Sequence, residues 1–321
     1  MNHRTLILEP KRYNPDAVEL YRKLGHVTFL DYDIKHIESK NLISIIVARL
    51  GYNLSDEFLG QFPNLNYIVS PTTGLNHIDS AYCRSKGIEI ISLKGESVFL
   101  DSIHSTSEHT LGLIFTLVRN IIPSALSVLN DRAWDRDRFV GRELSSLTLG
   151  VIGAGRIGRH VIEYGHLFRM NVLVCDPLKK KEDLNRLGVD VCSKSRLLSE
   201  SDIVTIHVDY RSENKNMFTF QEFGLMKQGS FFVNTSRGEL VAEQDLIAAL
   251  ESGHLAGAAL DVLADEHQMN HFFEKPIFEY AMQNRNLIIT PHIGGCTLDA
   301  MQKTELFVAE KLQKRLLSDD S

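Results

Sequence analysis

The sequence predicts an α/β protein built from two doubly wound parallel-sheet domains, and three observations lead to this fold class. Short apolar runs alternate with amphipathic helical patterns twice along the chain, and a long helical stretch near residues 102–130 separates the two series. The chain has 321 residues, which is more than one ordinary domain of this type needs. A glycine-rich turn follows the first strand of the second series, where such sheets bind ligands.

The first series covers roughly the first hundred residues. Because its predicted strands alternate with helical patterns, we expect parallel strands joined by right-handed crossovers. The helical stretch that follows is predicted as one long buried helix that crosses to the second domain. The predicted strands cover residues 5–8, 27–30, 43–47, 67–69 and 88–92, and the predicted helices cover residues 15–24 and 56–62.

The second series begins after a polar, charged stretch at residues 131–143. A helical tail at residues 297–317 follows it, and we expect this tail to pack back on the first domain, which is then discontinuous. The expected limits are residues 1–100 with 293–321 for the first domain and 101–292 for the second. The predicted strands cover residues 147–152, 172–175, 203–207, 231–234, 256–260 and 287–290, and the predicted helices cover residues 157–168 and 245–252.

The composition excludes several classes of partner. Lys plus Arg number 35 and Asp plus Glu number 41, so the formal net charge is −6, and we expect no binding to nucleic acid or to an anionic membrane surface. The amino-terminal apolar run is too short for a signal peptide. Arg119, Asn120 and Pro123 interrupt the most apolar stretch, residues 111–129, so a membrane span is not expected.

The cysteines indicate a reducing compartment and give no sign of a metal site. None of them forms a CxxC pair, and their spacings fit no zinc pattern. We therefore expect free thiols, a cytoplasmic location and no bound metal. The four cysteines are Cys83, Cys175, Cys192 and Cys296.

Residues 153–158 read Gly-Ala-Gly-Arg-Ile-Gly and form the GxGxxG pattern of dinucleotide-binding turns. An apolar strand leads in, a helical pattern follows, and a second strand ends in Asp176, 18 residues past the last glycine. Gly153 permits the tight turn, Gly155 lets a pyrophosphate approach the backbone, and Gly158 allows the helix to pack closely on the sheet. The helix N-terminus then offers its N–H groups to the phosphates, so the pattern predicts a Rossmann domain.

Asp176 bears on the choice of cofactor. Its carboxylate can accept hydrogen bonds from the adenosine ribose and would repel a 2′-phosphate, so NAD is predicted over NADP. The run Lys179-Lys180-Lys181 lies close behind and weakens this preference. The alternative, a glycine-rich turn without a ligand, is disfavoured by the combination of strand, helix and acid.

Four ordered motifs extend over most of the chain. They read Leu-Gly-Val-Ile-Gly-Ala-Gly-Arg-Ile-Gly at residues 149–158, Asn-Thr-Ser-Arg-Gly at 234–238, Gly-Ala-Ala-Leu-Asp-Val at 257–262 and Thr-Pro-His-Ile-Gly-Gly at 290–295. With these motifs the chain resembles the D-isomer-specific 2-hydroxyacid dehydrogenases, phosphoglycerate dehydrogenase among them. The resemblance implies an NAD-binding Rossmann domain, a flavodoxin-like substrate domain and catalysis between the two. It also implies a homodimer, for which residues 102–130 are the expected interface.

The resemblance implies a catalytic set of Arg237, Glu266 and His292. The arginine of this motif holds the substrate carboxylate and polarises the keto oxygen, for which a guanidinium has two parallel donors and a fixed charge. The histidine exchanges a proton with the substrate oxygen. The glutamate pairs with the imidazole and fixes which ring nitrogen faces the substrate. Asp265 and His267 adjoin Glu266, so the assignment of the acid is open by one residue.

The resemblance also extends the cofactor site beyond the glycine-rich turn. It implies that Asp261 contacts the nicotinamide carboxamide or its surroundings, and that His207 and Val208 lie on the adenine side. Besides these residues, the fingerprint glycines and Asp176, the expected cofactor contacts are Arg156, Ile157, Thr235, Ser236, Gly294 and Gly295.

Further substrate contacts are expected in the first domain. Residues 72–79 resemble the family's glycine-containing substrate loop, whose backbone N–H groups bind a carboxylate. Arg49 matches an arginine that phosphoglycerate dehydrogenases use near the substrate phosphate, although a solvated surface arginine is an equal alternative. Residues 94–104 either line the pocket or form a plain loop. The expected substrate contacts are Arg49, Thr73, Gly74, Leu75, Asn76, Arg237 and His292.

The predicted reaction is reversible hydride transfer between NAD and a small 2-hydroxy or 2-keto acid. D-3-Phosphoglycerate is the first substrate hypothesis, because of Arg49, and glyoxylate or hydroxypyruvate is the alternative. Two other functions stay open at this point. C-terminal-binding corepressors use the same fold as an NAD-sensing interaction module, and related formate dehydrogenases carry glutamine and histidine where this chain has Glu266 and His292, which argues against formate as substrate.

Overall fold

The computed structural model of the chain describes residues 3–30, 37, 39–266 and 272–319. Contacts divide the chain into two compact units, Met1–Ile103 with Cys296–Ser321 and His104–Gly295. The boundaries fall three residues later than the limits expected from the sequence, at 103 against 100 and at 295 against 292.

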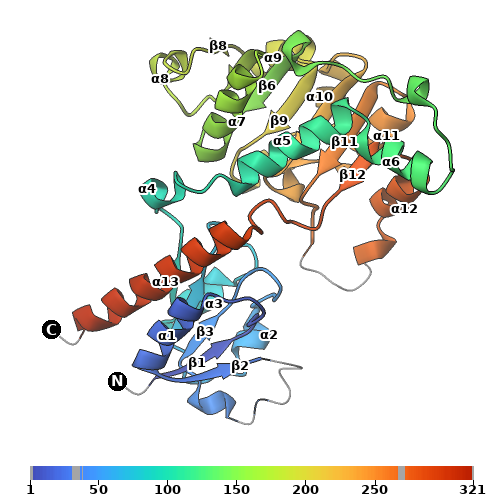
Figure 1. Cartoon of the computed structure of the whole chain (residues 1–321). Helices are drawn as coiled ribbons and strands as arrows, with labels where there is room; N and C mark the ends of the chain where they lie inside the picture. Colours follow the sequence, from blue (N-terminus) through green and yellow to red (C-terminus); the bar gives the residue numbers. More distant parts are fainter. Residues whose placement is uncertain (1–2, 31–36, 38, 267–271, 320–321) are drawn as a thin grey trace. The chain divides into compact units, whose positions relative to one another are not determined.

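The first unit is built on a five-stranded parallel sheet in the order β2-β1-β3-β4-β5 (Figure 1). This is the strand order of flavodoxin-like folds, and it confirms the doubly wound prediction for this part of the chain. The strands are β1 (His3–Ile7), β2 (Gly25–Phe29), β3 (Ile45–Val47), β4 (Tyr67–Ser70) and β5 (Glu89–Ser92), and the helices are α1 (Pro15–Leu24), α2 (Asp56–Leu59), α3 (Ser80–Lys86) and α4 (Ser97–Leu100).

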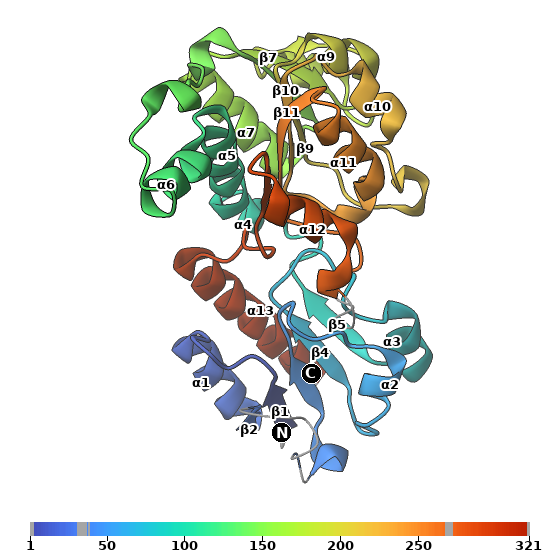
Figure 2. The same ribbon diagram turned by 90° about the vertical axis from the view of Figure 1, so that its right-hand side faces the viewer.

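The tail helix α13 (Leu298–Asp319) belongs to the same unit. It packs on α1, β4 and β5, and two views show it alongside α1 (Figures 1 and 2). Val308, Ala309 and Leu312 have no exposed surface and join the core beneath the sheet. The carboxyl-terminal segment therefore completes the unit that the amino-terminal segment begins.

Helix α1 shows how the local sequence sets an element of this unit. The Asn14 side chain accepts hydrogen bonds from the backbone N–H groups of Asp16 at 2.8 Å and Ala17 at 3.0 Å, which would otherwise lack a partner. Pro15 takes the first helical position, where its missing N–H costs nothing. The buried face of the helix consists of Ala17, Val18, Tyr21 and Leu24.

The second unit is built on a seven-stranded parallel sheet in the order β12-β11-β10-β9-β6-β7-β8. The six strands β6 to β11 follow the Rossmann order, and the strand order reverses between β6 and β9. The strands are β6 (Thr148–Ile152), β7 (Asn171–Cys175), β8 (Asp190–Val191), β9 (Ile203–Ile206), β10 (Ser230–Asn234), β11 (Leu255–Leu260) and β12 (Leu287–Ile289).

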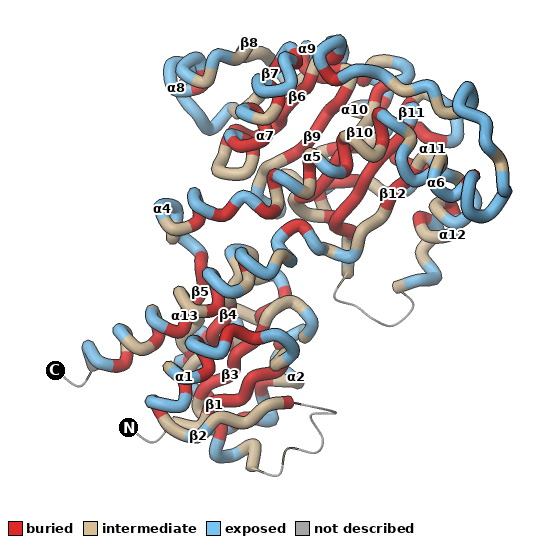
Figure 3. The backbone as a smooth tube through the Cα atoms, in the orientation of Figure 1, coloured by how far each residue is buried: buried red, intermediate tan, exposed pale blue. Residues whose placement is uncertain are grey.

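Two cores lie on the two faces of this sheet, because neighbouring residues of each strand point to opposite faces. Val233 of β10 joins the core that contains helices α5 and α7, whereas Phe232 joins the core that contains α9, α10 and α11. In Figure 3 the strands of the sheet are mostly buried. The helices are α5 (Ser105–Val118), α6 (Ile121–Leu129), α7 (Arg156–Leu167), α8 (Lys181–Asn185), α9 (Lys194–Glu200), α10 (Phe220–Leu225), α11 (Glu243–Glu251) and α12 (Pro276–Gln283).

The prediction of one long helix over residues 102–130 is wrong. The segment forms α5 and α6, separated by a break at which Asn120 takes a left-handed backbone with φ 51°. A continuous helix would place the Pro123 ring against the carbonyl of Arg119, whereas the first turn of a new helix tolerates a proline. Among the described residues no single helix is long and apolar enough to span a membrane; Ser97–Val118 with Ile121–Leu129 meets the length and composition only as a pair bent by 61°.

Candidate active site

Three turns at one edge of the seven-stranded sheet carry residues that the sequence singled out, two for catalysis and one for cofactor binding. Arg237 follows β10, Asp261 follows β11 directly, and His292 follows β12. Because β10, β11 and β12 are neighbouring parallel strands, their carboxyl ends meet at the same edge. This is the edge where open α/β sheets bind ligands.

His292 and Glu266 form a close pair. Nδ1 of His292 lies 2.5 Å from Oε1 of Glu266, and both side chains are largely buried. Since an ionised carboxylate can only accept, Nδ1 carries a hydrogen, and Nε2 is left without a partner among the described residues. The other carboxylate oxygen of Glu266 accepts the N–H of Leu263 at 3.3 Å. The geometry thus brings Glu266 to the imidazole; His267 lies outside the described residues.

Asp261 is buried beneath the His292 turn. Its carboxylate accepts hydrogen bonds from the Thr290 hydroxyl at 2.6 Å and from the N–H groups of Ile293 at 2.9 Å and Gly294 at 2.7 Å. Burial acts to raise the pKa of Asp261, but the bonds from His109, Thr290 and the backbone outweigh it, so the pKa lies below its ordinary value. The carboxylate that the sequence assigned to the cofactor is therefore engaged within the chain itself.

Arg237 lies on a turn that is held from both sides. The Asn234 carboxamide accepts from the N–H of Ser236 at 2.9 Å and donates to the carbonyl of Arg237 at 2.8 Å. The Ser236 hydroxyl donates to the carbonyl of Val208 at 2.5 Å, which ties this turn to the end of β9. The Arg237 guanidinium donates to the Ser236 carbonyl at 2.6 Å, and no described carboxylate forms an ion pair with it.

The glycine-rich turn between β6 and α7 fits a dinucleotide. Gly153 has φ 90°, and a Cβ on Gly158 would lie 1.9 Å from the Gly153 carbonyl oxygen, so larger residues would break the turn. A Cβ on Gly155 would meet no atom within 4 Å, which leaves its backbone open to a ligand. Helix α7 begins at Arg156 and has no side-chain cap, and the N-terminus of a helix favours phosphates. Ile157 follows in the same first turn.

Asp176 and His207 flank this turn. The Asp176 carboxylate accepts from the N–H of Ala154 at 2.9 Å and of Leu178 at 3.0 Å, which holds it beside the glycines. His207 as a residue is half-buried, but its Nδ1 is buried and has no hydrogen-bonding partner in the described part of the chain, while Nε2 lies 3.0 Å from the Thr205 hydroxyl. Burial lowers the pKa of His207 to about 3, so the ring is neutral.

Arg49 belongs to the first unit and follows β3. Its guanidinium donates two hydrogen bonds to one carboxylate oxygen of Glu305, from Nε at 2.8 Å and from Nη2. Nη1 donates to the Lys11 carbonyl at 3.1 Å, and the guanidinium lies over the Tyr13 ring. Glu9 accepts the backbone N–H of Arg49 at 2.6 Å. Burial raises the pKa of both Glu9 and Glu305, although Arg49 acts to lower it. The alternative of a solvated surface arginine is therefore wrong.

The other substrate residues expected in this unit lie between β4 and α3. The Thr72 hydroxyl donates to the Gly74 carbonyl at 2.8 Å, and the side chains of Thr73 and Asn76 are exposed. Leu75 is half-buried and packs against the core of the sheet. In the segment 94–104, Phe99 of α4 stacks on Phe307 of α13 with ring centroids 4.0 Å apart, so part of this segment serves to pack the tail helix.

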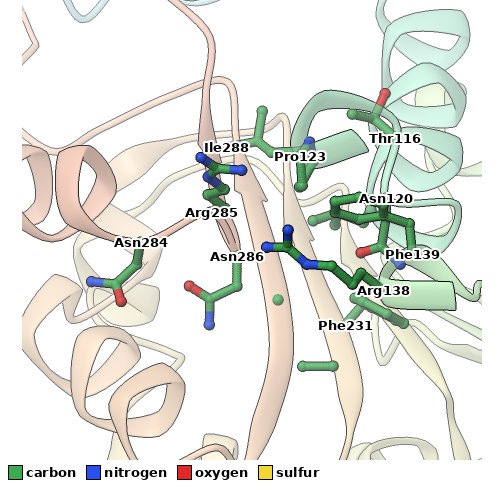
Figure 4. A pocket seen from close by; sticks show the side chains of 13 residues that line it. Thr116, Asn120, Pro123, Arg138, Phe139, Phe231, Asn284, Arg285, Asn286 and Ile288 are labelled. Carbon is green, nitrogen blue, oxygen red and sulfur yellow. The ribbon is translucent and has the colours of Figure 1, made fainter. Parts of the chain in front are cut away.

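A cavity of about 360 Å³ lies at the opposite edge of the seven-stranded sheet, at the amino ends of β10, β11 and β12 (Figure 4). Arg138 and Arg285 line it beside the apolar side chains of Phe139, Phe231 and Ile288. It borders the break between α5 and α6 and includes none of the residues expected to bind cofactor or substrate. The cavity is therefore separate from the candidate active site.

Comparisons with known proteins show the family to which the chain belongs. The family profile described as D-isomer specific 2-hydroxyacid dehydrogenase, NAD binding domain, matches residues 111–294. A D-3-phosphoglycerate dehydrogenase of Methanocaldococcus jannaschii is 31% identical over 314 residues, which are 97% of this chain and 57% of the relative. A Staphylococcus haemolyticus protein assigned to the 2-hydroxyacid dehydrogenases is 33% identical over 275 residues, 85% of this chain and 82% of the relative. The chain thus spans little more than half the length of the phosphoglycerate dehydrogenase relative.

Solved structures share the fold along the whole chain. A D-lactate dehydrogenase of Aquifex aeolicus, complexed with NAD and lactic acid, is 29% identical and matches with a TM-score of 0.83 over 99% of this chain and 96% of that chain. The matched family consists of NAD-dependent oxidoreductases that act on CH–OH groups. The chain belongs to the D-isomer-specific 2-hydroxyacid dehydrogenase family, and its second unit contains the NAD-binding domain of that family.

Proposed function

We propose that this protein catalyses reversible hydride transfer between NAD and C2 of a small 2-hydroxy or 2-keto acid, with Arg237, Glu266 and His292 as catalytic residues. The observation that carries the proposal is the His292–Glu266 pair, which leaves Nε2 of His292 without a partner among the described residues, at the sheet edge where Arg237 also lies. When bound, NAD supplies the hydride acceptor or, as NADH, the hydride donor. The chain's own residues bind the acid and move the proton.

In the direction of reduction, His292 donates a proton from Nε2 to the keto oxygen of the substrate. Glu266 stabilises the imidazolium before the transfer and keeps Nδ1 turned away from the substrate. Arg237 binds the substrate carboxylate and stabilises the negative charge that develops on the oxygen. In the direction of oxidation the same imidazole accepts the proton.

The proposed NAD site follows the edge of the same sheet. Gly153, Gly155 and Gly158 form the pyrophosphate cradle with the first turn of α7, and Asp176 accepts from the ribose hydroxyls. This arrangement favours NAD over NADP. We assign to the same site the remaining residues His207, Val208, Arg156, Ile157, Thr235, Ser236, Gly294 and Gly295. Asp261 contributes to the site by holding the turn of Gly294, because its carboxylate is already engaged within the chain.

For the substrate, the surroundings of Arg49 favour an unphosphorylated acid over D-3-phosphoglycerate. Similarity to proteins named D-3-phosphoglycerate dehydrogenase supports the phosphorylated substrate. However, Glu305 already compensates the charge of Arg49, and Glu9 lies beside them, so a phosphate would meet two carboxylates and one arginine. We therefore rank glyoxylate or hydroxypyruvate first. Thr73, Gly74, Leu75 and Asn76 remain the proposed contacts in this unit.

The test is the oxidation of NADH in the presence of a panel of 2-keto acids, each repeated with Arg49→Ala. We expect hydroxypyruvate or glyoxylate to react faster than phosphohydroxypyruvate, and the variant to keep this ranking. Turnover best with phosphohydroxypyruvate, lost selectively in the variant, would restore phosphoglycerate as the substrate. NADH binding without turnover of any keto acid would favour the interaction module instead.

We further propose a cytoplasmic homodimer that forms through the apolar surface of α6. Trp134 is 92% exposed, and it lies just beyond an α6 surface with several exposed aliphatic side chains. Exposed apolar side chains that cluster on one helix are typical of an interface. All four cysteines are free thiols, as expected in a reducing compartment.

Light scattering tests the proposed dimer. It should give twice the chain mass for the unaltered protein, and the double variant Leu126→Glu with Trp134→Ala should give the mass of the monomer. The exposed aliphatic residues are Ile121, Ile122, Leu126, Val128 and Leu129.

A further inference from the structure

Helix α5 carries three polar side chains at the carboxyl edge of the seven-stranded sheet. His109 and Thr110 are adjacent, and Thr106 precedes them by one turn, so the three lie on one side of the helix. Further along this side, Leu113 and Leu117 are buried in the core, and α5 packs on β10 and β11. Polar residues therefore replace core residues only where α5 passes the turns of the candidate active site.

His109 contacts the turn of His292. Its Nε2 lies 3.2 Å from Oδ1 of Asp261 and 3.1 Å from the hydroxyl oxygen of Thr290. The Thr290 hydroxyl donates its own hydrogen to Asp261 at 2.6 Å, and the carboxylate can only accept. Nε2 of His109 therefore carries a hydrogen and donates it between these two oxygens.

Asp261, which His109 holds in place, in turn holds the backbone around His292. Its backbone carbonyl accepts the N–H of His292 at 2.8 Å, and its carboxylate accepts the N–H groups of Ile293 and Gly294. His292 has φ 51°, a left-handed conformation that costs energy for a residue with a side chain and persists only where its surroundings fix it. The bonds from His109 through Asp261 fix the chain on both sides of His292.

Thr110 contacts the turn of Arg237. Its hydroxyl donates to the Thr106 carbonyl at 2.8 Å, so it accepts from the hydroxyl of Thr235, also at 2.8 Å. Thr235 is buried and lies two residues before Arg237. Adjacent residues of one helix thus hold the turn of Arg237 and the turn of His292.

We propose that His109 and Thr110 are positioning residues, which fix the separation between the Arg237 guanidinium and the His292 imidazole. This inference rests on the proposed function, because it assumes that both side chains act on one substrate. A displacement of about 1 Å in a reacting group can lower a rate roughly 100-fold. Loss of either contact should therefore be visible in kcat.

The test compares His109→Leu, which removes the N–H donor, with His109→Gln, which keeps an N–H donor at similar reach. Thr110→Val removes the second contact. Thr116→Val is the matched control, because Thr116 lies on the same helix and its hydroxyl also donates to a backbone carbonyl, that of Gly112 at 2.7 Å, without touching either turn.

We expect His109→Leu and Thr110→Val to lower kcat by roughly 10- to 100-fold while the Kd of NADH, measured by fluorescence titration, stays within about threefold. His109→Gln should recover most of the loss, and Thr116→Val should behave like the unaltered protein. A general loss of stability would not separate kcat from NADH binding in this way, and it would not be repaired by glutamine.

A double variant distinguishes positioning from an independent effect. If His109 acts through His292, adding His109→Leu to His292→Ala lowers kcat no further, because residues that act as a unit are not additive. The inference would be overturned if His109→Leu kept the kcat of the unaltered protein, or if His109→Gln were as slow as His109→Leu. It would also be overturned if His109→Leu lowered kcat by the same factor in the His292→Ala variant as in the unaltered protein. Failure of the proposed function looks different, because His292→Ala alone would then turn over keto acids at the unaltered rate.

Discussion

Arg237 and Arg49 occupy the same kind of position in two different sheets, but their surroundings differ. Each follows the carboxyl end of a parallel strand, β10 or β3, where open α/β sheets bind ligands. Arg237 donates to the carbonyl of its neighbour Ser236 and forms no ion pair with a described residue. Arg49 donates twice to Glu305, a residue 256 positions further along the chain.

The difference shows that a place at the edge of a sheet does not by itself make a charged side chain available to a ligand. Glu305 reaches Arg49 because α13 packs on the first unit, and the ion pair uses the charge that a substrate phosphate would need. Among the described residues Arg237 has only local partners, so its charge stays available for a substrate. We therefore expect opposite consequences from equivalent substitutions at the two sites.

The largest expected effect belongs to the edge that carries Arg237. His292→Ala should lower kcat roughly 100- to 10,000-fold, the usual contribution of a general acid or base. The Kd of NADH should change little, since the fingerprint turn is unaltered. Steady-state rates and fluorescence titration measure the two quantities, and turnover equal to the unaltered protein would remove His292 from the mechanism.

Next in size is the direct comparison of the two arginines. Arg237→Gln should lower kcat roughly 100- to 1,000-fold, because one charge that stabilises the developing oxyanion is lost. Arg49→Gln should leave kcat/KM for unphosphorylated acids within about twofold. It should instead lower the Tm, since buried Glu305 loses its partner, a change that costs about 3–5 kcal/mol when a pair is fully buried. Equal kinetic losses in both variants would abolish the distinction.

Glu305→Gln sharpens the same comparison. The substitution removes the carboxylate that compensates Arg49 and leaves the arginine charged. The ratio of kcat/KM for phosphohydroxypyruvate to that for hydroxypyruvate should rise about tenfold, since one unit charge near a surface contributes more than about 1 kcal/mol. An unchanged ratio would mean that Arg49 does not meet the substrate at all.

A similar or smaller effect is expected at the cofactor. Asp176→Ala should weaken NADH binding by about tenfold and narrow the preference for NADH over NADPH, because the ribose loses an acceptor and a 2′-phosphate no longer meets a negative charge. Kd values for both cofactors measure this change. If the ratio of the two Kd values stays the same, Asp176 does not select the cofactor.

The smallest effect concerns pH and stability. The folded protein lowers the pKa of His207 to about 3, so the unfolded chain binds a proton at this residue at a higher pH than the folded protein does. The contribution of the neutral ring to the free energy of unfolding is therefore complete above the ordinary histidine pKa of about 6.5, and it is lost as the pH falls below that value. The free energy of unfolding should fall by up to about 1.4 kcal/mol per pH unit from this group. Urea titrations at several pH values measure the slope, and His207→Gln should flatten it. Identical slopes would contradict a buried neutral ring.

The fold was predictable because its signal is repeated. Alternating strand and helix patterns predict both parallel sheets, and every predicted strand overlaps a strand in the structure. Short elements carry too few residues for a period to emerge: α3, α10 and the two-residue β8 were not predicted. The break at Asn120 was missed because the apolar pattern continues through it, although Pro123 gave a signal.

The residues of the site were predictable where short sequence motifs contain them. The geometry brings Glu266 to His292 and places Arg237 at the same sheet edge, as the motifs led us to expect, while the roles of these residues stay predictions. His109 and Thr110 were missed because a polar pair in an apolar helix is weak as a local signal. The Arg49–Glu305 pair depends on where α13 packs, which no local pattern specifies.

The most direct test of the account is the fate of an isotope. The protein is incubated with NADH in which both C4 hydrogens of the nicotinamide are deuterium, and with the best keto acid of the panel whose reduction makes C2 chiral, such as hydroxypyruvate. The product is analysed by mass spectrometry and chiral separation. We predict deuterium at C2 of the D-2-hydroxy acid, with formation slowed strongly by His292→Ala. A product without the label at C2, an L-isomer, or formation unaffected by the His292 variant would contradict the account.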